Sequence, residues 1–208
     1  MTWIIAFVLA LGVSTLPAVA QSRLSEKALG QLRATAAEIG AIEPGTVPEM
    51  LLKALIAAED PAHLRRSPES SNLTKQLARL HLGAMPSLQR QEAETALATY
   101  LSESMSPTDI ARAYAALVYF GRNCYGYREA AGGLARQSPE KADDTVWLAL
   151  AALPRSPSFY LRDRAALRDR VATLLVAMQK AGLIDMEEAQ RLENLPLASV
   201  DTGPGCSR

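Results

Sequence analysis

An acidic pair closes an apolar stretch of the sequence. Residues 51–58 read LLKALIAA, and Glu59 and Asp60 follow directly. A carboxylate at the end of an apolar helix can line a cleft, where it can accept a proton from a hydroxyl group. A solvated helix terminus is the simpler interpretation, because carboxylates with strongly shifted pKa values are a minority. The pair also opposes the helix dipole, and local costs of this kind cluster at functional sites.

A second candidate carboxylate lies in the segment 87–103. Apolar residues recur there at helical spacing and form a stripe. Glu94 flanks this stripe, whereas Glu92, two residues earlier, lies on a different face. Glu94 is therefore the better candidate for a carboxylate that faces a cleft. Arg90 lies four residues before Glu94, so an ordinary ion pair on the helix surface explains the spacing equally well.

A glycine-hinged loop in the second half of the chain carries Arg and Tyr side chains. Residues 121–128 read GRNCYGYR, with Arg122 and Tyr125 between Gly121 and Gly126. Guanidinium and aromatic groups on such a loop suit stacking on a sugar or binding of a phosphate. A structural turn packed by tyrosines is the alternative.

The remaining residues with reactive side chains are few. His63 and His81 have no partner at metal-ligand spacing, and we expect both at the surface. Cys124 and Cys206 are too few for a zinc site, which needs about four ligands. They could form one disulfide in an oxidising compartment, with two unpaired thiols as the equal alternative. The sequence has no P-loop, dinucleotide-binding glycine fingerprint or serine nucleophile elbow.

The composition is that of a globular domain without a charge bias. The chain has 208 residues, 49% of them hydrophobic, and its 22 basic residues balance its 22 acidic residues. This length allows one domain with a real core. The absence of a basic excess argues against nucleic acid as a partner. An anionic ligand must therefore be bound by local positive charge.

The first 20 residues are uncharged and end in Ala18-Val19-Ala20. This pattern predicts a secretory signal peptide that is cleaved after Ala20. An uncleaved membrane anchor is the alternative, because the apolar run is close to the roughly 20 residues that span a bilayer. Both interpretations place the domain outside the cytoplasm, in the periplasm or its equivalent, where it could associate with the inner membrane.

Helix signals recur along the rest of the chain. Thr46 precedes Glu49 at capping-box spacing, Ser71 can cap a helix, and the Ser-Pro pairs at 106–107 and 138–139 suit helix starts. No run of alternating β-branched residues is present, so the sequence predicts an all-α domain of about eight helices over residues 21–198. Residues 199–208 read as a disordered tail.

Several stretches, taken in order, resemble the motifs of the peptidoglycan glycosyltransferases, the domain of class A penicillin-binding proteins and of monofunctional transglycosylases. They are ALIAAED at 54–60, ESSNLTKQLARL at 69–80, the segment from RQEAE to YGYREAA at 90–131, LALAALPRSPSFY at 148–160, and a closing helix pair at 174–190. The family patterns are AxEDxxF, GGSTITQQLAKN, RKxxExxxAxxLE continuing to YFGxxxYG, and LLAALPxxPSxY. The resemblance covers about residues 47–197.

The resemblance implies a lysozyme-like fold that works at the outer face of the cytoplasmic membrane and polymerises lipid II onto a growing glycan strand. It places the general base at Glu59. It places at Glu94 the carboxylate that supports the leaving pyrophosphate, with a divalent cation such as Mg or Mn carried by that diphosphate and no metal held by the protein alone. Cell-wall synthesis proteins are possible partners. The motifs and the glycine-hinged loop together give the candidate substrate-binding residues Asp60, Ser71, Thr74, Lys75, Gln76, Arg79, Arg90, Arg122 and Tyr125.

The sequence also departs from the family pattern. Only residues 61–68 separate the first two motifs, so the fold is truncated there and a membrane-touching jaw is largely missing. Several motif residues are replaced: Glu69 and Ser70 stand for two glycines, Lys75 for a Gln, Gln91 for a Lys and Ala116 for an Asn. These departures leave two functions open, an active polymerase and a catalytically impaired module that binds glycan or lipid II as a scaffold. A lytic enzyme would rest on the shared architecture alone.

Overall fold

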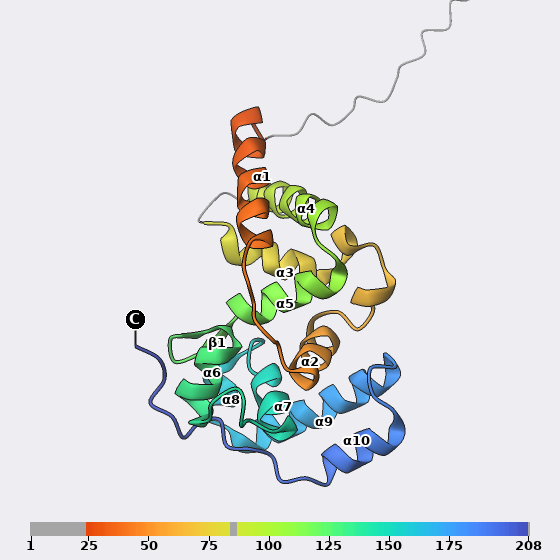
Figure 1. Ribbon diagram of the computed structural model, residues 1–208, viewed down its shortest axis with the longest axis vertical. Helices are drawn as coiled ribbons and strands as arrows, with labels where there is room; N and C mark the ends of the chain where they lie inside the picture. The colour runs from red at the N-terminus through yellow and green to blue at the C-terminus, as the bar shows by residue number, and fades with distance from the viewer. Residues whose placement is uncertain (1–23, 84–86, 208) are drawn as a thin grey trace, which may run out of the picture.

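The computed structural model describes residues 24–83 and 87–207 (Figure 1). The predicted signal peptide lies outside these ranges. Within them, the chain is mostly helical, which confirms the all-α, lysozyme-like fold class. No helix in the described ranges is both long enough and apolar enough to cross a membrane.

The helices and strands follow one another in this order: α1 (Glu26–Gly40), α2 (Glu49–Glu59), the 3₁₀ helices η1 (His63–Arg65) and η2 (Pro68–Ser70), α3 (Asn72–His81), α4 (Ser87–Ser104), α5 (Pro107–Leu117), β1 (Tyr119–Gly121), β2 (Cys124–Tyr125), α6 (Gly126–Ala135), α7 (Asp144–Ala152), α8 (Pro157–Tyr160), α9 (Arg164–Lys180) and α10 (Met186–Glu193). Helices α6 and α8 raise the number above the expected eight. The hairpin of β1 and β2 was not expected either, because it is too short to show an alternating pattern.

Helix α2 is the centre of the domain. Leu51, Ala54 and Leu55 are fully buried, and α2 packs against α5, α7 and α9. Helix α7 is buried on every side, as an apolar sequence without a polar face requires. In Figure 1, α1 stands against α4 at one end of the molecule, while α9 and α10 lie at the other end.

The predicted helix starts are partly confirmed. The side chains of Ser71 and Ser106 cap α3 and α5 by accepting from Leu73 N and Asp109 N. The capping box at Thr46 is wrong, since α2 begins after Pro48 without a side-chain cap. The helix expected at 138–139 begins later, where Asp143 accepts from two backbone amides of the first turn of α7. Asp143 provides a stronger cap than a Ser-Pro pair, because one carboxylate oxygen satisfies both donors.

The C-terminal segment differs from the disordered tail that the sequence predicts. Cys124 and Cys206 form a disulfide, which decides between the two alternatives for these cysteines. Val200 is buried, and the amide of Gly203 donates to the carbonyl of Leu134. Residues 199–207 therefore pack on the domain. These tertiary contacts order a segment whose sequence has little tendency to form a helix or a strand.

Candidate active site

Glu59 is the last residue of α2 and is half-buried in the wall of a pocket of about 330 Å³. The hydroxyl of Tyr114, on α5, donates a hydrogen bond to Glu59 Oε1 at 3.1 Å. Burial raises the pKa of Glu59, and the bond from Tyr114 and the positive charges of Arg170 and Arg155 only partly offset this effect. A carboxylate with a raised pKa is a stronger base, so this environment favours acceptance of a proton by Glu59.

Tyr114 remains a donor over the whole physiological range. Its side chain is buried, and burial together with the negative charge of Glu59 raises its pKa far above the ordinary value. The hydroxyl therefore stays protonated and fixes the orientation of the Glu59 carboxylate. The second carboxylate oxygen is left for a ligand in the pocket, whose lining residues are Ala58, Glu59, Gln76, Leu80, Tyr114, Val118, Tyr119, Pro154, Arg155 and Arg170.

Asp60 has a structural position beside this pocket. Its backbone is extended and ends α2, and the residue is 3% exposed. One carboxylate oxygen accepts from Ala62 N at 3.1 Å and the other from Asn72 N at 3.0 Å. Nη1 of Arg66 lies 3.6 Å from Oδ2 of Asp60. Asp60 thus ties the end of α2 to the start of α3, and the structure does not present it to a substrate.

The short connector between α2 and α3 is packed around His63. The prediction of a surface histidine is wrong, because His63 is fully buried. Its Nε2 bonds the carbonyl of Pro107 at 2.7 Å, and its Nδ1 bonds Ser71 Oγ at 2.7 Å. Burial lowers the pKa of His63, which keeps the ring neutral. Since a carbonyl only accepts, Nε2 carries the proton and Nδ1 accepts from Ser71.

The second motif contributes two residues that are closed off from solvent. Ser71 is buried and serves His63 and the α3 N-terminus, and Thr74 is buried on the same helix. The structure therefore separates both from a substrate, in contrast to the prediction. The hydroxyl of Thr74 has no hydrogen-bond partner among the described residues. The family motif predicts both as substrate-binding residues, because a motif does not show which of its side chains are buried.

Glu94 lines a second pocket, of about 570 Å³, that opens beside α3 and α4. It is 7% exposed, and both of its oxygens accept from Arg79, with Nε–Oε2 at 2.6 Å and Nη2–Oε1 at 2.9 Å. The ion pair expected with Arg90 is therefore formed by Arg79 instead. Lys75 and Arg90 line the same pocket. The structure thus brings together the three basic residues that the sequence assigns to a diphosphate.

The two pockets open on either side of the exposed surface of α3. Lys75 and Arg79 face the Glu94 pocket, and Gln76, one residue along from Lys75, faces the Glu59 pocket. Consecutive helical residues point about 100° apart, so one helix supplies both walls. The first site, with its isolated carboxylate, suits proton abstraction. The second, with excess positive charge, suits an anionic group.

The donor set of the Glu94 pocket does not fit a cation held by the protein alone. It has one carboxylate, whose two oxygens both accept from Arg79. No group of three or more His, Cys, Asp or Glu side chains suited to a metal lies within the described ranges. A divalent cation that arrives with a diphosphate stays a prediction.

The glycine-hinged loop is only partly directed to the site. Arg122 Nη1 donates to the carbonyls of Asp201 and Gly203, so the C-terminal segment occupies this predicted phosphate ligand. The ring of Tyr125 packs on Tyr119 at a centroid distance of 4.8 Å, and Tyr119 lines the Glu59 pocket. Tyr125 is therefore next to the pocket wall and does not itself line the cavity.

Sequence reasoning missed the partners of Glu59. Tyr114, Arg155 and Arg170 come from α5, from the turn after α7 and from α9. Arg155 lies inside the AALPRSPSFY block and Tyr114 five residues before the YFG block, so the motifs contained a signal for both. Arg170 had no such signal.

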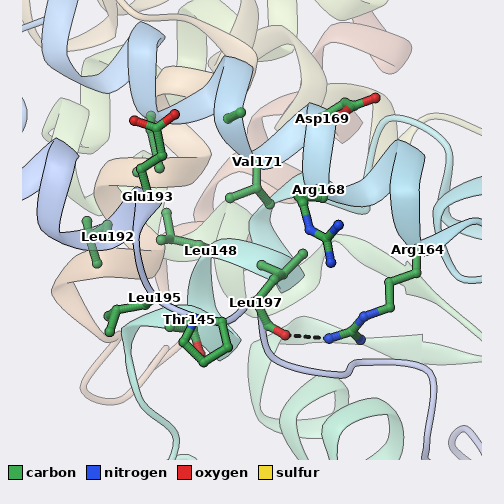
Figure 2. A pocket seen from close by; sticks show the side chains of 13 residues that line it. Thr145, Leu148, Arg164, Arg168, Asp169, Val171, Leu192, Glu193, Leu195 and Leu197 are labelled. Carbon is green, nitrogen blue, oxygen red and sulfur yellow. Dashed lines mark hydrogen bonds between the residues drawn. The ribbon is translucent and has the colours of Figure 1, made fainter.

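A third pocket, of about 400 Å³, lies between α7, α9, α10 and the segment after α10 (Figure 2). Its walls are largely apolar, with Leu148, Val171 and Leu197 among them, and Arg164 donates to the carbonyl of Leu197 at 2.5 Å. The α9 residues that line it recur at helical spacing on the face opposite Arg170. This pocket is thus separated by α9 from the Glu59 pocket. Its two lining carboxylates, Asp169 and Glu193, are exposed, whereas Glu59 is half-buried.

The comparison with known proteins identifies a family for this chain. The family model described as transglycosylase matches residues 63–179, more than half of the chain. The matched range includes Glu94, Arg155 and Arg170, and it begins after Glu59 and Asp60. No curated protein matches the sequence. The chain therefore belongs to the transglycosylase family, the peptidoglycan glycosyltransferases.

Proposed function

We propose that this protein polymerises lipid II into glycan strands during cell-wall synthesis, with Glu59 as the general base. The observation that carries the proposal is the environment of Glu59, half-buried, oriented by Tyr114 and flanked by two arginines in an open pocket. The basic pocket around Glu94, on the other side of α3, gives a place for the diphosphate of the donor.

The reaction follows from these two environments. The acceptor's sugar hydroxyl attacks the anomeric carbon of the donor strand, and its proton passes to the free carboxylate oxygen of Glu59. The bond between that carbon and the diphosphate oxygen breaks, and the lipid diphosphate leaves with the electron pair. Glycosyl transfer passes through an oxocarbenium-like state, so a proton acceptor and a stabilised leaving group both lower the barrier. Lys75, Arg79 and Arg90 stabilise the charge on the diphosphate.

The proposed location is the outer face of the cytoplasmic membrane, after export by residues 1–20. Lipid II and the nascent strand are the proposed partners, and other cell-wall synthesis proteins could supply the surface that the short connector lacks. The uncharged leader and the disulfide between Cys124 and Cys206 support this location, because disulfides persist in oxidising compartments.

A scaffold without catalysis is the second candidate function. The observation in its favour is Arg79, which is engaged by Glu94 with two nitrogens and so is only partly available to a diphosphate. The short connector at residues 61–68, where the membrane-touching jaw of the family is largely missing, also favours this function. Such a module would bind lipid II or glycan in the same pockets.

The test is lipid II polymerisation by the purified mature protein. We expect glycan strands from the wild type, and a loss of about 10²–10⁴-fold for Glu59→Gln, the range that general bases contribute. Glu103→Gln, an exposed residue on α4, is the matched control and should keep full activity. Binding of lipid II without any product from the wild type would establish the scaffold function instead.

A further inference from the structure

We propose that the C-terminal segment 200–206, which we call the strap, is a positioning element of the Glu59 pocket that acts through Arg122 and the hairpin of β1 and β2. The inference deepens the proposed function and rests on it for its effect on catalysis. The strap is the segment for which the sequence predicts disorder, and none of its residues belongs to the motifs.

The strap is fixed to the hairpin turn by one covalent bond and three hydrogen bonds. Cys206 is joined to Cys124 of β2 by the disulfide, and its amide donates to the carbonyl of Arg122 at 2.9 Å. Arg122 Nη1 donates in return to the carbonyls of Asp201 and Gly203, at 2.9 and 2.8 Å. Arg122 therefore binds the start of the strap with its guanidinium and the end of the strap with its backbone carbonyl.

The strap also fits helix α6 closely. The amides of Gly203 and Gly205 donate to the carbonyls of Leu134 and Gly133, each at 2.9 Å. A Cβ at Gly203 would lie 1.9 Å from the carbonyl oxygen of Gly133, and one at Gly205 would lie 2.6 Å from that of Arg122. Both contacts involve backbone, so nothing can yield. The strap is seated in a place that only glycine at these two positions allows.

The hairpin connects the strap to the pocket over a few residues. Its turn contains Arg122 and Asn123, both in the left-handed region at φ 46° and 61°, a conformation that residues other than glycine hold only when the surroundings fix it. At the other end of the hairpin, Val118 and Tyr119 line the Glu59 pocket. Strand pairing places Tyr119 opposite Tyr125.

The strap therefore holds the turn, and the turn holds one wall of the pocket. Glu59 itself is on α2, and its partner Tyr114 is on α5, so the base does not depend on the hairpin. Loss of the strap should move Tyr119 and Val118, and with them the fit of the sugar, while it leaves proton acceptance unchanged. Arg122 is thus a positioning residue and not a phosphate ligand.

The test compares Arg122→Gln with Arg122→Lys. One nitrogen, Nη1, makes both bonds to the strap, so a lysine ammonium with three donors can replace it and glutamine cannot make both with equal strength. Arg112→Gln, which removes only an exposed pair with Asp109 on α5, is the matched control. Cys206→Ser, which removes the disulfide and keeps the backbone hydrogen bonds of the strap, is the second strap variant.

Two measurements decide the outcome. In amide hydrogen exchange, Arg122→Gln and Cys206→Ser should lose protection at residues 118–126 by about tenfold or more, while α2 and α7 keep theirs and show that the fold persists. In polymerisation, KM should rise by about ten- to a hundredfold with the pH profile of kcat unchanged, because a misplacement of about 1 Å in a substrate-positioning group can cost up to about 10²-fold. Arg122→Lys should restore both readouts in large part.

The inference is overturned if the strap variants expose the amide of Cys206 but leave the exchange of residues 118–126 and the KM at wild-type values. The exchange measurement needs no activity. A wild type that makes no glycan strands would therefore refute the proposed function alone, and the coupling of strap and pocket wall would still be decided by exchange.

Discussion

Two carboxylates of this protein, Glu59 at the end of α2 and Glu94 in the middle of α4, lie in contrasting environments on either side of α3. Glu59 accepts one hydrogen bond from a neutral hydroxyl and has its pKa raised by burial. Glu94 is more buried, yet both of its oxygens accept from one guanidinium. Glu94 is therefore fully paired, whereas Glu59 has one carboxylate oxygen that accepts no hydrogen bond from the described residues. This difference is the basis of the two proposed roles, proton acceptance at Glu59 and charge stabilisation at Glu94.

The largest effect outside Glu59 should come from Arg79→Gln, which removes both bonds to Glu94. Glu94, a residue that is only 7% exposed, is then left without a partner for its carboxylate. We expect the free energy of unfolding to fall by about 1–3 kcal/mol. Chemical denaturation measures this value. The value is below the full cost of breaking a buried pair, since the Arg79 side chain is 52% exposed.

The matched control for this change is Arg90→Gln in the same pocket. It has no bond to Glu94, so its effect on stability should stay within about 0.5 kcal/mol. Equal destabilisation by the two variants would mean that the Glu94 environment depends on general positive charge and not on the paired geometry.

The same basic pocket should control substrate affinity. Arg90→Gln and Lys75→Gln each remove one positive charge near the expected diphosphate. We expect KM for lipid II to rise by about tenfold and kcat to fall as well, because the charge on the diphosphate grows as it leaves. Steady-state polymerisation at two salt concentrations measures the effect. An unchanged KM in the double variant would place the diphosphate elsewhere, with Arg155 and Arg170 as the next candidates.

Much of this arrangement follows from the sequence, and the parts that follow are local. The end of α2 at Glu59, the caps at Ser71 and Ser106 and the position of Glu94 beside an apolar stripe all depend on neighbours within one or two turns. Helix periodicity and capping chemistry contain this information directly. The truncated connector was also visible as a short interval between two motifs.

The parts that the sequence did not predict depend on distant partners. Glu94 pairs with Arg79 on another helix and not with Arg90 on its own, and His63 is buried by a contact with Pro107, 44 residues away. The strap is ordered by a disulfide across 82 residues. Nothing in local spacing distinguishes these contacts from solvent exposure, because tertiary packing decides them.

A smaller effect should appear in the pH dependence of stability. The folded-state pKa of Glu59 is raised above the ordinary value of 4.5, so its contribution to stability is present below that value and is lost as pH rises through the folded-state pKa. In Glu59→Gln the side chain cannot ionise, so this loss of stability with rising pH does not occur. We therefore expect the variant to gain stability relative to wild type as pH rises above 4.5, as measured by thermal unfolding across pH.

The opposite sign would break the comparison between the two carboxylates. If Glu59→Gln lost stability with rising pH relative to wild type, the native pocket would favour the charged form. Glu59 would then resemble a paired carboxylate and would not be the stronger base.

The smallest effect is expected from Tyr114→Phe. The hydroxyl lowers the pKa of Glu59, so its removal should raise that pKa further and move the acidic limb of the rate profile to higher pH. The expected cost in unfolding free energy is about 1 kcal/mol, typical of one hydrogen bond. A profile that keeps its acidic limb would show that a group other than Glu59 sets it.

The most direct measurement compares Glu59→Gln and Glu94→Gln in the same polymerisation assay, with kcat and KM determined separately for lipid II. We predict that Glu59→Gln lowers kcat by about 10²–10⁴-fold while lipid II still binds, and that Glu94→Gln raises KM and keeps measurable turnover. If Glu94→Gln abolishes kcat and Glu59→Gln retains it, the roles of the two pockets are reversed and Glu59 is not the general base.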